Sequence, residues 1–206
     1  RQNKNFAMRE FNTSGPNIPH QHYTVQREDL VQKGIKLVEK DRYFTIWAPR
    51  QTGKSTYFRQ LAERLDSMGY KVADINFENY KNASLDSFVY ELSKRLKEFW
   101  NIDVTNEKDI ARIFSLISET KNEKNVLIID EVEGINEKYF GDFLHSVRNA
   151  YHSRATHCLK SVILVGISNI VGVVSDNASP FNIADNLNVP YFTDAEVFEL
   201  LGQHEN

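Results

Sequence analysis

Residues 48–56 constrain the fold of this chain more than any other stretch. They read Ala-Pro-Arg-Gln-Thr-Gly-Lys-Ser-Thr and fit the phosphate-binding pattern G-x-x-x-x-G-K-[ST], except that Ala48 replaces the first glycine. An apolar run at residues 43–47 precedes them, and a helix-like stretch at residues 54–68 follows. The pattern marks a phosphate-binding loop in this strand–loop–helix context.

Each part of this loop has an expected chemical role. Backbone N–H groups of residues 51–56 would surround an anion at the positive end of the following helix. Lys54 would reach the β- and γ-phosphates, and the Ser55 hydroxyl would ligate Mg²⁺. A turn that merely starts an ordinary helix is the alternative. The residues predicted to bind phosphate are Arg50, Gln51, Thr52, Gly53, Lys54, Ser55 and Thr56.

A second informative feature is the apolar run at residues 125–129, which ends in Asp130 and Glu131. A run of β-branched residues without alternation is typical of a strand that is buried on both faces of a parallel sheet. Such sheets bind ligands at the carboxyl ends of their strands. Asp130 is therefore predicted to hold the Mg²⁺ shell, and Glu131 to act as the general base toward the attacking water. The alternative is a strand that ends in two solvated acids.

Another buried strand is expected at residues 161–167, and Ser168 and Asn169 follow it. A polar side chain at the end of this strand, beside the γ-phosphate, could orient the water that attacks it. Asn169 is the first candidate for this catalytic role and Ser168 the second. An asparagine that caps the next turn is an equally good interpretation of Asn169.

Together these features resemble the P-loop ATPases with an extra strand between the phosphate-loop strand and the acid-bearing strand. This group includes AAA+ proteins, STAND ATPases and ORC-type replication initiators. The likeness is greatest to bacterial AAA-like ATPases, which have a similar Ala-Pro-Arg-Gln-x-Gly-Lys-[ST] loop and a similar Phe-x-x-x-x-Arg helix, here residues 143–148. The strand end at residues 165–169 is similar to the sensor strand of the initiators. The resemblance covers residues 8–203 and implies a three-layer α/β/α fold, a mainly parallel sheet and Walker A and Walker B motifs.

The resemblance also implies roles for residues before the loop. STAND and AAA+ proteins have an Arg-Glu-x-Leu entry, similar to residues 27–30, where the chain passes over the adenine. It implies that Tyr23 and Val25 pack near the base and that Arg27 touches ribose or phosphate. A capped surface helix with a solvated Arg27 is the alternative. Adenine is inferred from the resemblance, and the sequence has no Asn-Lys-x-Asp guanine reader.

Length and composition agree with one α/β unit. A chain of 206 residues, 41% hydrophobic and 26% charged, can bury a sizeable core. The net charge of −3 provides no case for nonspecific nucleic-acid binding. No apolar run approaches the ~18 residues that span a bilayer. A single cysteine, Cys158, excludes an internal disulfide and suits the cytoplasm, the expected location.

Residues 1–22 are polar and turn-rich and are expected to form an N-terminal arm before an ATPase core at residues 23–206. We expect this core to belong to a longer protein, without a lid or winged-helix domain of its own. No Lys or Arg occurs from residue 161 onward, so Arg148 and Arg154 are the nearby candidates for an arginine that acts in trans. A solvated helix face is the alternative for both. Further strands are expected at residues 70–77 and 186–191, and helices from residue 30 to about 40 and at 84–100, 107–119, 137–153 and 194–201.

The expected function is therefore Mg²⁺-dependent binding and hydrolysis of ATP to ADP by a nucleotide-driven switch. Its expected partner is a second copy or another protein that supplies an arginine. One alternative is a noncatalytic interaction module that holds a nucleotide. The other is the ATPase core of a DNA-associated protein, although the acidic balance counts against DNA binding by this segment.

Overall fold

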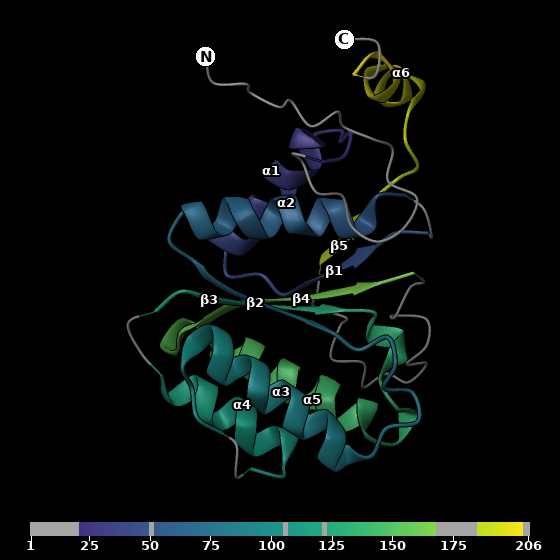
Figure 1. Cartoon of the computed structure of the whole chain (residues 1–206). Helices are drawn as coiled ribbons and strands as arrows, with labels where there is room; N and C mark the ends of the chain where they lie inside the picture. The colour runs from purple at the N-terminus through teal and green to yellow at the C-terminus, as the bar shows by residue number, and fades with distance from the viewer. Residues whose placement is uncertain (1–20, 50–51, 105–106, 121–122, 168–184, 204–206) are drawn as a thin grey trace, which may run out of the picture.

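A computed structural model describes residues 21–49, 52–104, 107–120, 123–167 and 185–203. These residues form a five-stranded sheet with helices on both faces (Figure 1). The strands are β1 (Phe44–Trp47), β2 (Lys71–Asn76), β3 (Asn125–Asp130), β4 (Leu159–Gly166) and β5 (Asp185–Asn188). All neighbouring strands are parallel, and their order is β2-β3-β4-β1-β5. The expected three-layer α/β/α fold is confirmed.

The helices divide between the two faces of the sheet. They are α1 (Glu28–Glu39), α2 (Lys54–Ser67), α3 (Leu85–Trp100), α4 (Ile110–Glu119), α5 (Glu137–Ser153) and α6 (Asp194–Gly202). Figure 1 shows α1 and α2 over one face and α3, α4 and α5 over the other, with α6 beyond α1. Among the described residues we find no helix with the length and hydropathy of a membrane span.

Strand β4 lies between β1 and β3, where the resemblance places the extra strand. Its Ile163 is aligned with Phe44 of β1 on one side and with Ile128 of β3 on the other. Parallel strands end at the same edge of a sheet. The loop that follows β1, the acids that end β3 and the chain that follows β4 therefore meet at one edge.

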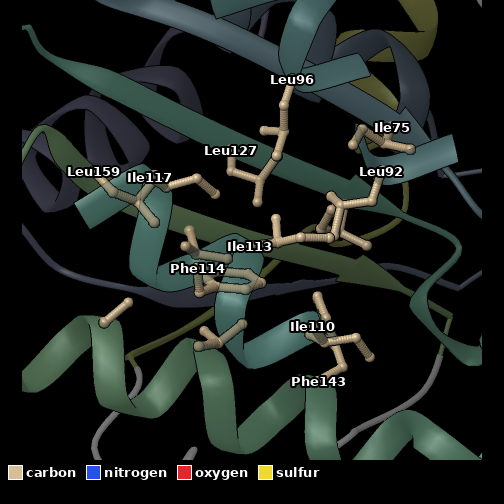
Figure 2. Close-up of a cluster of buried hydrophobic side chains, with 14 of the residues drawn as sticks. Ile75, Leu92, Leu96, Ile110, Ile113, Phe114, Ile117, Leu127, Phe143 and Leu159 are labelled. Carbon is tan, nitrogen blue, oxygen red and sulfur yellow. The ribbon is translucent and has the colours of Figure 1, made fainter. Parts of the chain in front are cut away.

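Two hydrophobic clusters hold the layers together. The larger cluster joins α3, α4 and α5 to one face of the sheet (Figure 2). The smaller cluster joins α1 and α2 to the other face. Strand β3 contributes to both, since Leu127 and Ile129 lie in the larger cluster and Val126 and Ile128 in the smaller one. This confirms that the unbroken apolar run is buried on both faces.

Local interactions at chain ends explain where the elements differ from the predicted ranges. Helix α4 begins at Ile110 rather than residue 107, because Asp109 is extended and its carboxylate accepts the N–H of Ala111 at 2.7 Å. Strand β4 begins at Leu159, which is aligned with Asn125. Strand β5 ends before Pro190, which has no N–H to donate to the sheet. The predicted arm at residues 1–22 lies outside the described residues except for its last two.

Candidate active site

The predicted phosphate loop continues directly from the sheet. The N–H of Ala48 donates to the carbonyl of Gly166 at 3.1 Å, and the Thr52 hydroxyl donates to the carbonyl of Pro49 at 2.8 Å. Ala48 is fully buried in the smaller hydrophobic cluster, so its methyl group packs where the pattern has a glycine. The predicted ligands Arg50 and Gln51 lie outside the described residues.

Gly53 joins this loop to helix α2 in a conformation that suits glycine. Its φ of 76° lies in the left-handed region, where a Cβ is strained. A Cβ at this position would also lie 2.9 Å from the ring of Phe192. The sequence did not indicate that Phe192 contacts the loop, because it lies far along the chain, just before α6.

Lys54 meets both predicted acids. Its Nζ lies 2.5 Å from Oε1 of Glu131 and 3.3 Å from Oδ1 of Asp130. Burial acts to lower the pKa of Lys54, but the hydrogen bond and charge of Glu131 and the charge of Asp130 outweigh it and raise the pKa. The side chain therefore carries its positive charge between the loop and the end of β3.

Asp130 is held by neighbouring donors. Its Oδ1 accepts the backbone N–H of Glu131 at 2.9 Å, and its Oδ2 accepts the side-chain amide of Asn76 at 3.3 Å. Burial raises the pKa of Asp130, and the charge of Lys54 partly offsets this increase. Asn76 was not predicted from the sequence to be a site residue. Its position at the end of a strand beside β3 was the signal that could have identified it.

Glu131 has an uncommon backbone conformation for a residue with a side chain. Its φ of 52° and ψ of 48° lie in the left-handed region. Such a conformation costs of order 1–3 kcal/mol and persists where the surrounding structure fixes it. A short 3₁₀ turn, Val132–Gly134, follows, and the N–H of Gly134 donates to the Glu131 carbonyl at 2.8 Å. Strain of this kind concentrates at functional sites.

The N-terminal segment reaches the loop through Arg27, whose side chain is 3% exposed. Its guanidinium makes two hydrogen bonds to the Glu196 carboxylate, at 3.1 and 3.3 Å. It also donates to the carbonyls of Thr52, at 3.2 Å, and Pro190, at 2.9 Å, and its Cζ lies 4.4 Å from the Phe192 ring centroid. The alternative of a solvated Arg27 is therefore wrong.

Several predicted roles remain predictions. Tyr23 and Val25 are buried, and Ser55 and Thr56 lie in the first turn of α2. Their contacts with a nucleotide, like a contact of Arg27 with ribose or phosphate, are not tested by these positions. Asn169 and its runner-up Ser168 lie outside the described residues.

The two arginines that could act in trans have intramolecular contacts near the end of α5. Nε of Arg148 lies 3.4 Å from Nε2 of His152. Arg154 lies over the ring of Tyr151, 3.8 Å from its centroid, and donates to the Tyr151 carbonyl at 2.8 Å. Arg154 thus stabilises the helix end in this structure. A role in trans for either residue stays a prediction.

The donor groups fit a magnesium ion that is shared with a phosphate ligand. Asp130 provides a carboxylate and Ser55 a hydroxyl, both of them the hard oxygen ligands that Mg²⁺ prefers. Within the described ranges, no group of three or more His, Cys, Asp or Glu residues could hold a metal ion. Mg²⁺ commonly takes one or two protein ligands and completes its shell with water and phosphate oxygens.

Comparison with known proteins identifies a matching family. The model of the AAA-like domain family matches residues 14–206. A comparison with curated protein sequences gave no match.

Solved structures with a similar fold include Cdc6p from Pyrobaculum aerophilum, with a TM-score of 0.62 and 16% identity over 89% of this chain and 50% of that chain. Aeropyrum pernix ORC2, solved as ADPNP-ADP complexes, has a TM-score of 0.58 and 15% identity over 86% of this chain and 50% of that chain. Drosophila ORC bound to poly(dA/dT) DNA and Cdc6 has a TM-score of 0.57 and 16% identity over 85% of this chain and 30% of that chain. The chain thus spans half or less of these proteins, and identity this low shows a shared fold alone.

Proposed function

We propose that this chain, which belongs to the AAA-like domain family, binds ATP with Mg²⁺ and hydrolyses it as a nucleotide-driven switch. The observation that carries the proposal is the meeting of Lys54, Asp130 and Glu131. One ammonium lies 2.5 Å from one carboxylate and 3.3 Å from the other, although the acids follow Lys54 by more than seventy residues. This meeting of the loop lysine with the two acids supports a site at which phosphate, metal and water act together.

The proposed chemistry follows from these positions. Phosphate oxygens would compete with the two carboxylates for Lys54, so nucleotide binding would release Asp130 and Glu131. Asp130 and Ser55 would then hold Mg²⁺, which neutralises charge on the β- and γ-phosphates when it is bound. Glu131 would accept a proton from water as the water oxygen bonds to the γ-phosphorus. The bond to the β–γ bridging oxygen breaks, and the products are ADP and inorganic phosphate.

Steady-state phosphate release with Mg-ATP tests this function. We expect turnover by the wild-type protein, loss of nucleotide binding in Lys54→Ala, and binding without turnover in Glu131→Gln. Glu63→Gln is the matched control, because Glu63 is an exposed carboxylate on the same helix as Lys54. Intact ATP affinity in Lys54→Ala would remove the site assignment, and unchanged turnover in Glu131→Gln would remove Glu131 as the base.

A noncatalytic nucleotide-bound module is the second candidate. It is favoured by the engagement of Glu131 with Lys54, since a base held by a cation is not free to activate water. Tight binding of ADP and ATP with no phosphate release under any condition would support this candidate against the first. Turnover that appears only when an arginine-bearing partner or a second copy is added would instead support a partner-dependent ATPase.

A DNA-associated ATPase is the third candidate, and the likeness to initiators solved with DNA supports it. The net charge of −3 counts against binding to the DNA backbone by these residues. Phosphate release measured with and without duplex DNA separates the cases. Stimulation that disappears at high salt would support an association with DNA.

A further inference from the structure

Glu133 connects the turn behind the two acids to the end of the neighbouring strand. It lies in the 3₁₀ turn that follows β3, and it is exposed at the rim of the site. Its Oε1 accepts the backbone N–H of Ile167 at 3.1 Å. Ile167 directly follows β4, and the paired residues of β3 and β4 end at Ile129 and Leu164. The Glu133 side chain therefore links the two chains beyond the end of the ladder.

Gly166, the last residue of β4, makes room for this contact. A Cβ at Gly166 would lie 2.7 Å from Oε2 of Glu133 and 3.3 Å from Cγ1 of Val132. Its φ is not among the positive values found in this structure, so the backbone there does not require glycine. The absent side chain is explained by the space that the Glu133 carboxylate occupies.

Glu133 lies in the same turn as the proposed base. Glu131 directly precedes this 3₁₀ turn, and the N–H of Gly134 closes it by donating to the Glu131 carbonyl at 2.8 Å. The hydrogen bond from Ile167 to Glu133 therefore ties the turn that carries Glu131 to the end of β4.

We propose that Glu133 is a positioning residue for ATP hydrolysis. Its hydrogen bond with Ile167 fixes the turn that carries Glu131 relative to the end of β4, and thereby the position from which Glu131 would accept a proton. The proposal rests on the proposed function of the site. A general base must lie about 2.6–3.2 Å from the atom that gives up its proton, and a displacement of about 1 Å can lower the rate by about 10²-fold.

Two substitutions at Glu133 separate positioning from folding. Glu133→Ala removes the contact with Ile167, whereas Glu133→Gln keeps an oxygen that can accept the Ile167 N–H. We expect Glu133→Ala to lower kcat by about 10-fold or more with KM changed less than about 3-fold. We expect Glu133→Gln to stay within about 3-fold of the wild-type kcat. Wild-type kcat in Glu133→Ala, or equal losses in both variants, would overturn the proposal.

Gly166→Ala and Glu78→Ala complete the set. Gly166→Ala retains the Glu133 carboxylate but displaces it from its position. We therefore expect Gly166→Ala to lower kcat, as Glu133→Ala does. Glu78→Ala removes an exposed carboxylate just beyond β2, at the same edge of the sheet, and is expected to retain the wild-type kcat. A wild-type kcat in Gly166→Ala would argue against the positioning role, as would a loss in Glu78→Ala equal to that in Glu133→Ala.

Hydrogen–deuterium exchange at the Ile167 amide detects the hydrogen bond between Ile167 and Glu133 independently of turnover. We expect faster exchange there in Glu133→Ala and wild-type exchange in Glu133→Gln. Unchanged exchange in Glu133→Ala would overturn the link between Glu133 and the end of β4. If the wild-type protein binds nucleotide but shows no turnover, the proposed hydrolysis fails and the positioning role fails with it. The exchange data would still decide whether the link exists.

Discussion

Nζ of Lys54 lies 2.5 Å from Oε1 of Glu131, so the cation of the phosphate loop is neutralised by the proposed base. A phosphate ligand must displace this carboxylate before it can pair with Lys54. The two side chains are only 10% and 25% exposed, so their attraction is screened less by water than that of a surface pair. The pairing of Lys54 with Glu131 would thus oppose phosphate binding.

Removal of the Glu131 charge should therefore tighten nucleotide binding. We expect Glu131→Gln to lower the Kd for ADP by about 3- to 10-fold in the absence of Mg²⁺, because the competing charge is lost. Titration of a fluorescent ADP analogue measures this change. Glu63→Gln on the same helix should leave the Kd unchanged. A Kd that stays constant or increases in Glu131→Gln would show that the ion pair does not compete with phosphate.

The Arg27–Glu196 pair should tolerate lysine poorly. Lysine cannot make two parallel hydrogen bonds to Glu196, and it loses the contacts with two carbonyls and the Phe192 ring. We expect Arg27→Lys to lower the free energy of unfolding by about 2–4 kcal/mol in urea denaturation.

Arg64→Lys is the matched control for Arg27→Lys, because Arg64 pairs with Glu28 on the surface with side chains 46% and 51% exposed. It should change the free energy of unfolding by less than about 0.5 kcal/mol. Equal effects of the two substitutions would mean that burial of the Arg27 pair contributes nothing to stability.

Two glycines should respond to alanine in opposite directions. A Cβ at Gly134 would lie 2.2 Å from the carbonyl oxygen of Phe77, whereas a Cβ at Gly141 would have no atom within 4 Å. We expect Gly134→Ala to destabilise the protein by about 2–4 kcal/mol. Gly141→Ala, in the interior of α5, should stabilise it by about 0.5–1 kcal/mol. Thermal unfolding of both variants measures the difference, and a stable Gly134→Ala would contradict the tight packing of the turn after the acids.

His157 should make stability depend on pH. The N–H of Leu159 donates to its Nδ1 at 3.1 Å, so Nδ1 is unprotonated and Nε2 donates to the carbonyl of Ala150 at 2.8 Å. Burial lowers the pKa of His157, and the charge of Lys160 lowers it further. The hydrogen bond to the Ala150 carbonyl and the charge of Asp41 act in the opposite direction, but the net effect is a lowered pKa. The native state therefore favours the neutral ring.

The sign of this pH dependence follows from proton uptake by the unfolded state. Unfolded His157 binds a proton near its ordinary pKa of about 6.5, and the native protein binds it at lower pH. The free energy of unfolding should fall as the pH decreases below about 6.5, until the native ring is protonated as well. Urea unfolding of wild type and His157→Gln between about pH 7.5 and 5.5 measures it. The variant should lose less stability over this range, and an equal loss would assign the pH dependence to other groups.

Much of the architecture could be predicted because it depends on local patterns. The signals for the apolar run before Asp130, the strand–loop–helix context of Lys54 and the helix predicted at residues 194–201 each lie within a few neighbouring residues. Element boundaries were harder to predict. Helix α4 begins at Ile110 because Asp109 caps it. The prediction placed Asp109 inside the helix, since the sequence did not show that its side chain caps the first turn.

The contacts between residues of the site were harder to predict from the sequence pattern. Asn76 could have been found only from the strand order, because it ends β2 and donates to the acid at the end of β3. The left-handed backbone of Glu131 has no local signature, since nothing in an Asp-Glu-Val sequence requires it. Phe192 meets Gly53 because the chain after β5 returns to the loop.

The sequence by itself determined which segments are strands and helices, and it predicted which side chains would serve phosphate, metal and water. Hydrophobic periodicity and turn chemistry act between near neighbours, so they can be read along the chain. The tertiary structure decided the partners: Lys54 with Glu131, Arg27 with Glu196, and Glu133 with Ile167. These pairs depend on the order of strands in the sheet and on the burial of both its faces, which arise from packing between segments far apart in the chain.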